Sequence, residues 1–438
     1  MTELRRFTLG NGLRVLLSPT RAASTVAISV HYDVGFRSEP VGRSGFAHLF
    51  EHLMFQGSAH HPKLAHWQYV QGLGGTVNGS THQDYTDYYQ LLPSEGLGHV
   101  LALEADRMGS LLISEETLRN QRAVVKEEIR LNVLNRAYGG FPWIPLPALL
   151  YSTYPNAHNG YGDFADLDSA TVEDATDFYL TRYVPANAVL TVAGAFDADE
   201  AETLIEGLFG PLTDRPAPSP SSLDEPPLTD SVHGSATDIH APLPALALGY
   251  RLPDPATELE AYVARMVLCE ILTTGPSSLL HTRLVSDSGL AVRVSAGCGL
   301  FNSLDARSPD TLAVVATYHS DTDSNAVLAE TDAALASAAD KPVATSLFPV
   351  AARRLVARIQ RRNADLLART RALGAYELLH GRAELVDDLA GRVGTVDQDA
   401  VVGAAAELSS CPRAVLRLVP GRISPGSATP VTKAVQTR

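Results

Sequence analysis

Two histidines and a glutamate within five residues form the part of this 438-residue chain best suited to metal chemistry. His48, Glu51 and His52 belong to the stretch 45–57, whose residues favour a short helix that Ser44 is placed to cap. Positions three and four apart share a helical face, so both imidazoles can hold one ion while the carboxylate acts on its water. The neighbouring residues are apolar, and a bound cation would remove the cost of burying these polar groups.

A further carboxylate comes from a helix expected between Glu115 and about Arg136, with Ser114 as its cap. Glu128 lies beside the apolar stripe of this helix, so it can point inward as a third ligand. Gln121, two turns earlier on the same face, is placed to support the site. A single glutamate on a charged helix is ordinarily solvated, and it is the histidine pair that favours the metal role. The stripe consists of Leu118, Val124, Val125, Ile129 and Val133.

The first half of the chain combines strands and helices without regular alternation. Asn11-Gly12 predicts a hairpin within residues 6–17. A stretch rich in Thr and Tyr, from Gly74 to Leu92, predicts a turn followed by one or two strands. Further strands are expected at 26–34 and 187–194, and further helices at 62–72, 94–112, 171–183 and 199–209.

The second half repeats the order of the first, and the two together predict an α+β fold of two duplicated domains. In each domain helices are expected on one face of a mainly antiparallel sheet. The expected domains are 1–212 and 233–422, joined by a proline-rich linker at 213–232 and followed by a disordered tail at 423–438. The strands expected in the second half are 246–250, 290–297, 312–318 and 415–420, and its helices are 257–272 and two between about 346 and 379.

The bulk composition is that of an ordinary globular protein, with 45% apolar residues. The formal charge of −14 argues against nucleic acid as a partner and favours, weakly, a cationic ligand. Neither a signal-length apolar run at the start nor a span of about eighteen apolar residues is found, which predicts a cytoplasmic protein without a membrane span. The scattered Cys269, Cys298 and Cys411 are expected to be core thiols.

Several of these features together resemble the M16 family of zinc peptidases, which carry the inverted His-x-x-Glu-His order. The resemblance covers about residues 5 to 420. It rests on the motif at 48–52 with Glu128 following, on Gly74-Gly75 before Asn78, and on the segment 183–187 before a strand that ends in Gly194. It implies the M16/LuxS-like metallohydrolase fold.

The resemblance also implies roles for the residues of the site. His48, His52 and Glu128 would be the ligands of one Zn²⁺ per chain, and Glu51 the general base that activates water against a peptide carbonyl. The segment Asn78, Gly79 and Ser80 matches the family's edge strand, on which an extended peptide pairs by its backbone.

Two departures from the family pattern stand out. Gln121 occupies the position where the family has a glutamate that supports the metal site. The family also carries, in the second half, an arginine and a tyrosine that hold the substrate and the developing oxyanion, and here these positions are Val285 and Val292. We therefore predict a zinc-bearing subunit of a heterodimer, whose homologous partner supplies the arginine and tyrosine.

Other interpretations stay open. The chain could be a self-sufficient homodimeric peptidase in which Arg283 or Arg293 replaces the missing arginine, although each is shifted along the chain from the family position. It could also be a non-catalytic structural subunit, or a zinc-stabilised protein that binds peptides without cleaving them.

Overall fold

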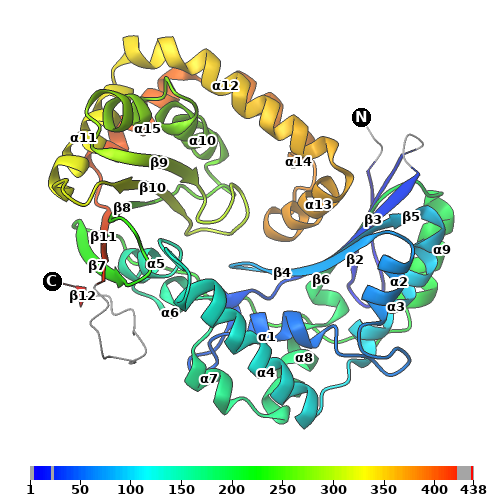
Figure 1. Ribbon diagram of the computed structural model, residues 1–438. Coiled ribbons are helices and arrows are strands. Elements are labelled where there is room, and N and C mark those ends of the chain that lie inside the picture. Colours follow the sequence, from blue (N-terminus) through cyan, green and yellow to red (C-terminus); the bar gives the residue numbers. More distant parts are fainter. Residues whose placement is uncertain (1–3, 21–23, 422–435, 438) are drawn as a thin grey trace. The chain divides into compact units, whose positions relative to one another are not determined.

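The computed structural model describes residues 4–20, 24–421 and 436–437 (Figure 1). Contacts between residues divide the chain into two compact units. Each unit contains one six-stranded sheet and several helices, which confirms the predicted α+β class and its duplication. The first unit comprises Met1–Glu127, Gly160–Ser222 and Arg361–Asp387, and the second comprises Glu128–Asn159, Leu223–Gln360 and Asp388–Arg438.

The two units are interleaved along the chain. Residues 128–159 belong to the second unit, and residues 361–387 belong to the first. The predicted domains 1–212 and 233–422 follow the order of the sequence and therefore miss this exchange. Most of the predicted tail falls on residues 422–435 and 438, which lie outside the described part of the chain. Within the tail, Gln436–Thr437 form the short strand β12.

The first sheet has the strand order β1-β2-β6-β3-β5-β4. Only β2 and β6 run parallel, and the other neighbouring pairs are antiparallel. The turn at Asn11-Gly12 joins β1 to β2 as predicted, and Gly12 has a φ of +85° there. The strand β4 lies at the edge of this sheet. The strand bounds are β1 (Arg5–Thr8), β2 (Arg14–Pro19), β3 (Thr25–Tyr32), β4 (Thr76–Thr81), β5 (Thr86–Pro93) and β6 (Ala188–Gly194).

Helices lie on both faces of the first sheet. Tyr32 on β3 and Tyr88 on β5 form a T-shaped, edge-to-face contact on one face of the sheet, where the Tyr88 hydroxyl donates to the carbonyl of Phe50 in α1. Alternate residues of β3 point to the other face, where Ser29 donates to a carbonyl of α13. The helices of this unit are η1 (Phe36–Ser38), α1 (Phe46–Leu53), α2 (Ala65–Gly72), η2 (Ser94–Gly96), α3 (Leu97–Ser110), α4 (Glu115–Ile129), α7 (Phe164–Ser169), α8 (Val172–Arg182), η4 (Pro185–Asn187), α9 (Ala198–Phe209) and α13 (Leu366–His380).

The second sheet has the order β12-β7-β11-β8-β10-β9, and its strands β7 to β11 repeat the order of β2 to β6 in the first sheet. The outer strand differs, since β12 comes from the end of the chain and β1 from its beginning. Again one pair, β7 and β11, is parallel, and β9 takes the edge position that β4 has in the first sheet. The same order of five strands and the same single parallel pair in both sheets are the strongest structural sign of duplication. The strand bounds are β7 (Val232–Asp238), β8 (Ala245–Arg251), β9 (Ala291–Cys298), β10 (Thr311–Tyr318) and β11 (Ala414–Pro420).

A helix from the exchanged segment packs on the second sheet as α13 does on the first. Leu146 and Leu149 of α5 lie against Gly249 of β8 and Gly234 of β7, where a Cβ atom would come within about 3.0 Å of their side chains. Glycine at these two positions therefore lets the helix approach closely. The helices of this unit are α5 (Pro145–Leu150), α6 (Tyr154–Ala157), α10 (Leu259–Thr273), α11 (Ser324–Ala338), α12 (Lys341–Ala364), α14 (Leu385–Thr395) and α15 (Gln398–Ser410), with π-helical segments η3 (Arg130–Leu134) and η5 (His281–Asp287).

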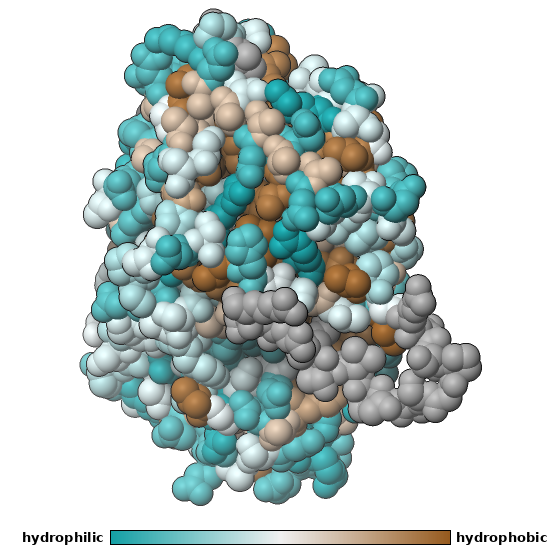
Figure 2. Space-filling model, turned by 90° about the vertical axis from the view of Figure 1, so that its left-hand side faces the viewer, coloured by the Kyte–Doolittle hydropathy of each residue, from teal (hydrophilic) through white to brown (hydrophobic). Residues whose placement is uncertain are grey.

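None of the helices in the described part of the chain is both long and apolar enough to cross a bilayer. Figure 2 shows one face of the molecule, on which hydrophobic residues are interspersed with hydrophilic ones.

Candidate metal centre

The first helix carries His48, Glu51 and His52 and is mostly buried. It begins after Gly45, and the prediction that Ser44 caps it is wrong. The cap comes instead from Glu39, whose two carboxylate oxygens accept hydrogen bonds from the backbone N–H groups of Gly45 (2.9 Å) and Ala47 (2.8 Å). A carboxylate at this position also complements the positive end of the helix dipole.

The start of α1 is fixed by a close approach of two glycines. Gly45 has a φ of +92°, a left-handed conformation that favours glycine. A Cβ atom on Gly45 would lie 2.7 Å from the Cα atom of Gly162 in the segment before α7. The backbone N–H of Ser44 donates to Asp166 of α7 (2.9 Å). Both residues that precede α1, Ser44 and Gly45, therefore contact the segment around α7.

Three potential ligand atoms converge beside α1. One atom each from His48, His52 and Glu128 lie within 4.8 Å of one another, and among the described residues this is the group of three that could hold a metal ion. The two imidazole rings have centroids 5.1 Å apart and are nearly perpendicular, and His48 is buried. Glu128 lies in the last turn of α4, whose preceding turns all belong to the first unit.

This set of donors fits zinc in chemistry and number. Two imidazoles and one carboxylate are the ligand set of many catalytic zinc sites, which leave one position open. Tetrahedral zinc with bonds of about 2.0–2.2 Å places its ligand atoms about 3.4 Å apart, which is a short movement from the observed spacing. Small side-chain rotations would close that difference.

The predicted stripe of α4 is largely buried, and it explains how Glu128 is aimed. Leu118, Val125 and Ile129 are at most 5% exposed, but Val124 is 47% exposed and does not belong to the buried stripe. Gln121 is 6% exposed and lies two turns before Glu128. Its supporting role stays a prediction.

The edge strand β4 contacts Glu51 directly. The Thr81 hydroxyl donates a 2.7 Å hydrogen bond to the Glu51 carboxylate. A Cβ atom on Gly79 would lie 3.0 Å from Cγ of Glu51, so the absence of a side chain at Gly79 makes room for the glutamate. Thr81 was not recognised from the sequence, although residues two apart on a strand share a face and Gly79 was already a candidate.

The residues predicted to bind substrate all lie on this edge strand. Asn78 is exposed and its side-chain oxygen accepts from the Gly79 N–H (3.0 Å), while Gly79 is buried and Ser80 is half-buried. Among the described residues β4 pairs with β5 alone and lies at the edge of the sheet, so its other side can accept an extended chain.

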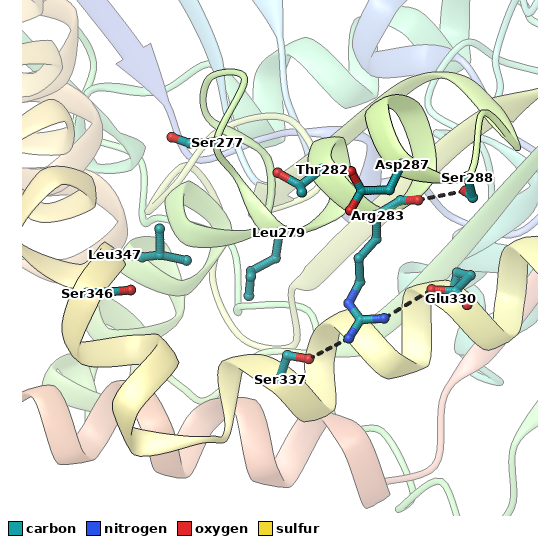
Figure 3. A pocket seen from close by; sticks show the side chains of 10 residues that line it. All are labelled: Ser277, Leu279, Thr282, Arg283, Asp287, Ser288, Glu330, Ser337, Ser346 and Leu347. Carbon is teal, nitrogen blue, oxygen red and sulfur yellow. Dashed lines mark hydrogen bonds and ion pairs between the residues drawn. The ribbon is translucent and has the colours of Figure 1, made fainter.

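The substitutes considered for the missing arginine lie in the second unit. Figure 3 shows Arg283 in a pocket of about 700 Å³, pointing toward Glu330 and Ser337 of α11, to which it donates at 3.1 and 3.0 Å. Val285 lies in η5, and Val292 on the edge strand β9 is 48% exposed. Arg293, also on β9, is exposed.

Family models match most of the chain. The insulinase (peptidase family M16) model matches residues 14–136, which include all the candidate ligands, and the peptidase M16 inactive domain model matches residues 169–355. With these matches and the duplicated α+β fold, the chain belongs to the M16 peptidase family.

Individual relatives agree with this assignment. The zinc protease PqqE of Helicobacter pylori is 31% identical over 65% of this chain and 64% of its own length. A probable mitochondrial-processing peptidase subunit beta of Arabidopsis thaliana is 27% identical over 49% of this chain and 40% of its own length. Both alignments therefore span less than two thirds of the relative. The crystal structure of a protease from Helicobacter pylori has the same fold, with a TM-score of 0.88, 24% identity, and coverage of 96% of this chain and 100% of that chain.

Proposed function

We propose that this chain is a zinc-dependent endopeptidase that cleaves extended or unstructured peptides. The observation that carries the proposal is the convergence of His48, His52 and Glu128 within 4.8 Å beside Glu51, which is itself bonded to the edge strand through Thr81. A candidate metal site, a general base and the edge of a sheet thus lie close together in space.

Each group of the chain has a defined task in this proposal. A zinc ion held by the three ligands would supply Lewis acidity, polarising a carbonyl and making water more acidic. Glu51 takes the proton from the attacking water and gives it to the leaving amine. The Thr81 hydroxyl fixes the orientation of that carboxylate. The free side of β4 binds the peptide backbone, so that recognition depends little on sequence.

The test separates metal binding from catalysis. Glu51→Gln should keep one zinc per chain and lose peptide hydrolysis by about 10²–10⁴-fold, because it removes the base and retains the shape. His48→Ala and Glu128→Ala should lose zinc, whereas Glu127→Gln, an exposed neighbour on α4, should keep both zinc and activity. Absence of zinc in the purified wild-type chain would overturn the proposal in favour of a structural subunit.

We further propose that the chain acts as the zinc-bearing subunit of a heterodimer. The support is the presence of Val285 and Val292 where the family resemblance expects an arginine and a tyrosine. Such a partner would be a homologous chain that carries this pair. Activity should then be weak for the isolated chain and rise when that partner is added. Strong turnover by the isolated chain would contradict this arrangement.

The competing arrangement is a self-sufficient homodimer that uses Arg283 or Arg293. The contacts of Arg283 argue against a role in holding the substrate, because its guanidinium is already paired with Glu330 and hydrogen-bonded to Ser337. Arg283→Gln and Arg293→Gln would distinguish the two arrangements, since a loss of hydrolysis in either variant of the isolated chain favours the homodimer. A cytoplasmic location also remains part of the proposal, to be checked by fractionation.

A further inference from the structure

An arginine from far along the chain reaches the edge of the first sheet. Arg371 lies on α13, and its Nε and Nη2 donate to the two carboxylate oxygens of Asp87 on β5 at 2.6 and 3.0 Å. Asp87 is fully buried, whereas the Arg371 side chain is 29% exposed. The guanidinium is therefore anchored by a buried carboxylate while its side chain stays partly exposed.

Two more contacts set the position of this guanidinium. Nη2 of Arg371 also donates to the hydroxyl of Ser80 on β4 (3.2 Å). The guanidinium carbon lies 3.9 Å from the centre of the Tyr89 ring, a cation–π contact. Burial lowers the pKa of Arg371, but the charge and hydrogen bonds of Asp87 outweigh this and raise it, so the group is a permanent cation.

The third nitrogen of this guanidinium, Nη1, can donate to a ligand. Within the described residues, the hydrogen bonds of Arg371 use Nε and Nη2, and none uses Nη1. Nη1 carries two N–H donors on a charged group, and each can donate a charge-assisted hydrogen bond to a carboxylate oxygen.

Arg371 and Glu51 lie on opposite faces of the edge strand β4. Gly79 and Thr81 face Glu51, as the spacing at Gly79 and the hydrogen bond of Thr81 show. Side chains alternate along a strand, so Ser80, which lies between them, faces α13 and Arg371. A peptide paired with β4 would alternate in the same way.

A substrate peptide paired with β4 would bring one of its side chains close to Nη1 of Arg371. Neighbouring strands lie about 4.8 Å apart, and directly opposite residues have Cβ atoms about 4.5–5.5 Å apart. A substrate residue opposite Ser80 would therefore start within one short side chain of the guanidinium that Ser80 itself contacts. An aspartate or glutamate there can cover that distance.

We propose that Arg371 is a specificity-determining residue, which selects an acidic side chain at the one substrate position that lies opposite Ser80 on the α13 face of β4. The inference rests on the proposed peptidase function, since it assigns a preference to the same edge strand. The whole chain has a formal charge of −14, which disfavours acidic peptides in general. A preference created by Arg371 must therefore be confined to one position.

A binding experiment tests this without depending on turnover. Zinc-loaded Glu51→Gln protein is titrated with fluorescent peptides that are identical except for a single glutamate, glutamine or lysine moved along the sequence. We expect one position at which glutamate binds at least about 10-fold more tightly than lysine, with glutamine between them. Equal affinities at every position would overturn the inference.

Matched variants assign the preference to Arg371. Arg371→Lys keeps a positive charge beside Asp87 and removes the forked donors, so the preference for glutamate should fall. Arg369→Lys is the control, because Arg369 lies on the same helix but pairs with Asp387. Ser80→Asp leaves the Arg371–Asp87 pair intact and offers the guanidinium an internal carboxylate, so it too should remove the preference.

The outcomes distinguish this inference from the proposed function. If zinc is bound and peptides bind but the glutamate preference survives both Arg371→Lys and Ser80→Asp, the role of Arg371 is wrong and the peptidase proposal stands. If neither zinc nor peptide binds to folded protein, the peptidase proposal itself fails.

Discussion

The hydroxyl of Thr81 donates a 2.7 Å hydrogen bond to the Glu51 carboxylate, and so joins the helix of the candidate ligands to the edge of the sheet. Glu51 lies on α1 and Thr81 ends β4, thirty positions later in the chain. In the proposed enzyme the same contact aligns the base with a peptide paired along β4. The position of the base is thus tied to the position of the substrate.

Thr81→Val should reduce catalysis without reducing metal binding. Hydrogen bonds to charged groups contribute about 1.5–3 kcal/mol, so we expect kcat/KM to fall about 10- to 100-fold if the bond orients Glu51 in the transition state. Thr81→Ser keeps the hydroxyl and should retain most activity. Peptide hydrolysis and zinc content are measured together, and a Thr81→Val variant with full activity would show that the bond does not matter.

Glu39→Ala should destabilise helix α1. It removes both acceptors for the N–H groups of Gly45 and Ala47, and we expect a loss of about 1–3 kcal/mol in the free energy of unfolding. Glu39→Gln retains one acceptor and should lose less. Chemical unfolding measures the change. Equal stability of both variants and the wild type would mean that Glu39 is not the cap.

Gly45→Ala should be poorly tolerated, because two independent effects oppose it. The residue has a φ of +92°, and its new Cβ would lie 2.7 Å from the Cα of Gly162. Left-handed strain and this clash together predict a loss of more than about 2 kcal/mol. Gly42→Ala is the control, since Gly42 has a φ of +81° but nothing within 4 Å of its added Cβ. Thermal unfolding of the two variants separates strain from clash.

The parts of the site that are local in sequence could be predicted. His48 and His52 are one helical turn apart, so any helix over this stretch places them together. Glu128 needed a second step, the apolar stripe of α4, and the structure brings it within 4.8 Å of the two histidines. Alternation and the Asn11-Gly12 turn likewise predicted the hairpin β1–β2.

The parts that depend on distant contacts could not be predicted. Arg371 and Asp87 are 284 positions apart, and an amphipathic helix pattern indicates a buried face without indicating which sheet buries it. The exchange of α5 and α13 between the units is hidden for the same reason. Ser44 was the expected cap by local rules, but the carboxylate of Glu39 is folded back to satisfy two N–H groups at once.

Glu225, in the predicted linker, should stabilise the second unit in a pH-dependent manner. Burial alone would raise the pKa of its carboxyl, but hydrogen bonds from Thr153, Ser152 and Asn156 outweigh burial and lower the pKa to about 2. A pKa that is lower in the folded state than its ordinary 4.5 gives stability that is complete above about pH 4.5 and is lost as the pH falls toward 2. Removing the carboxylate should therefore matter most near neutral pH.

Glu225→Gln should thus unfold more easily than the wild type near neutral pH, by about 1–3 kcal/mol, because the amide accepts fewer of the hydrogen bonds that Ser152, Thr153 and Asn156 donate. The difference from the wild type should shrink as the pH falls from about 4.5 toward 2, since the wild-type carboxyl is then protonated as well. Chemical unfolding across this pH range measures it, with the exposed Glu116→Gln as a control that should show little change at any pH. If the difference in the free energy of unfolding stays constant with pH, the charge of Glu225 does not contribute to stability.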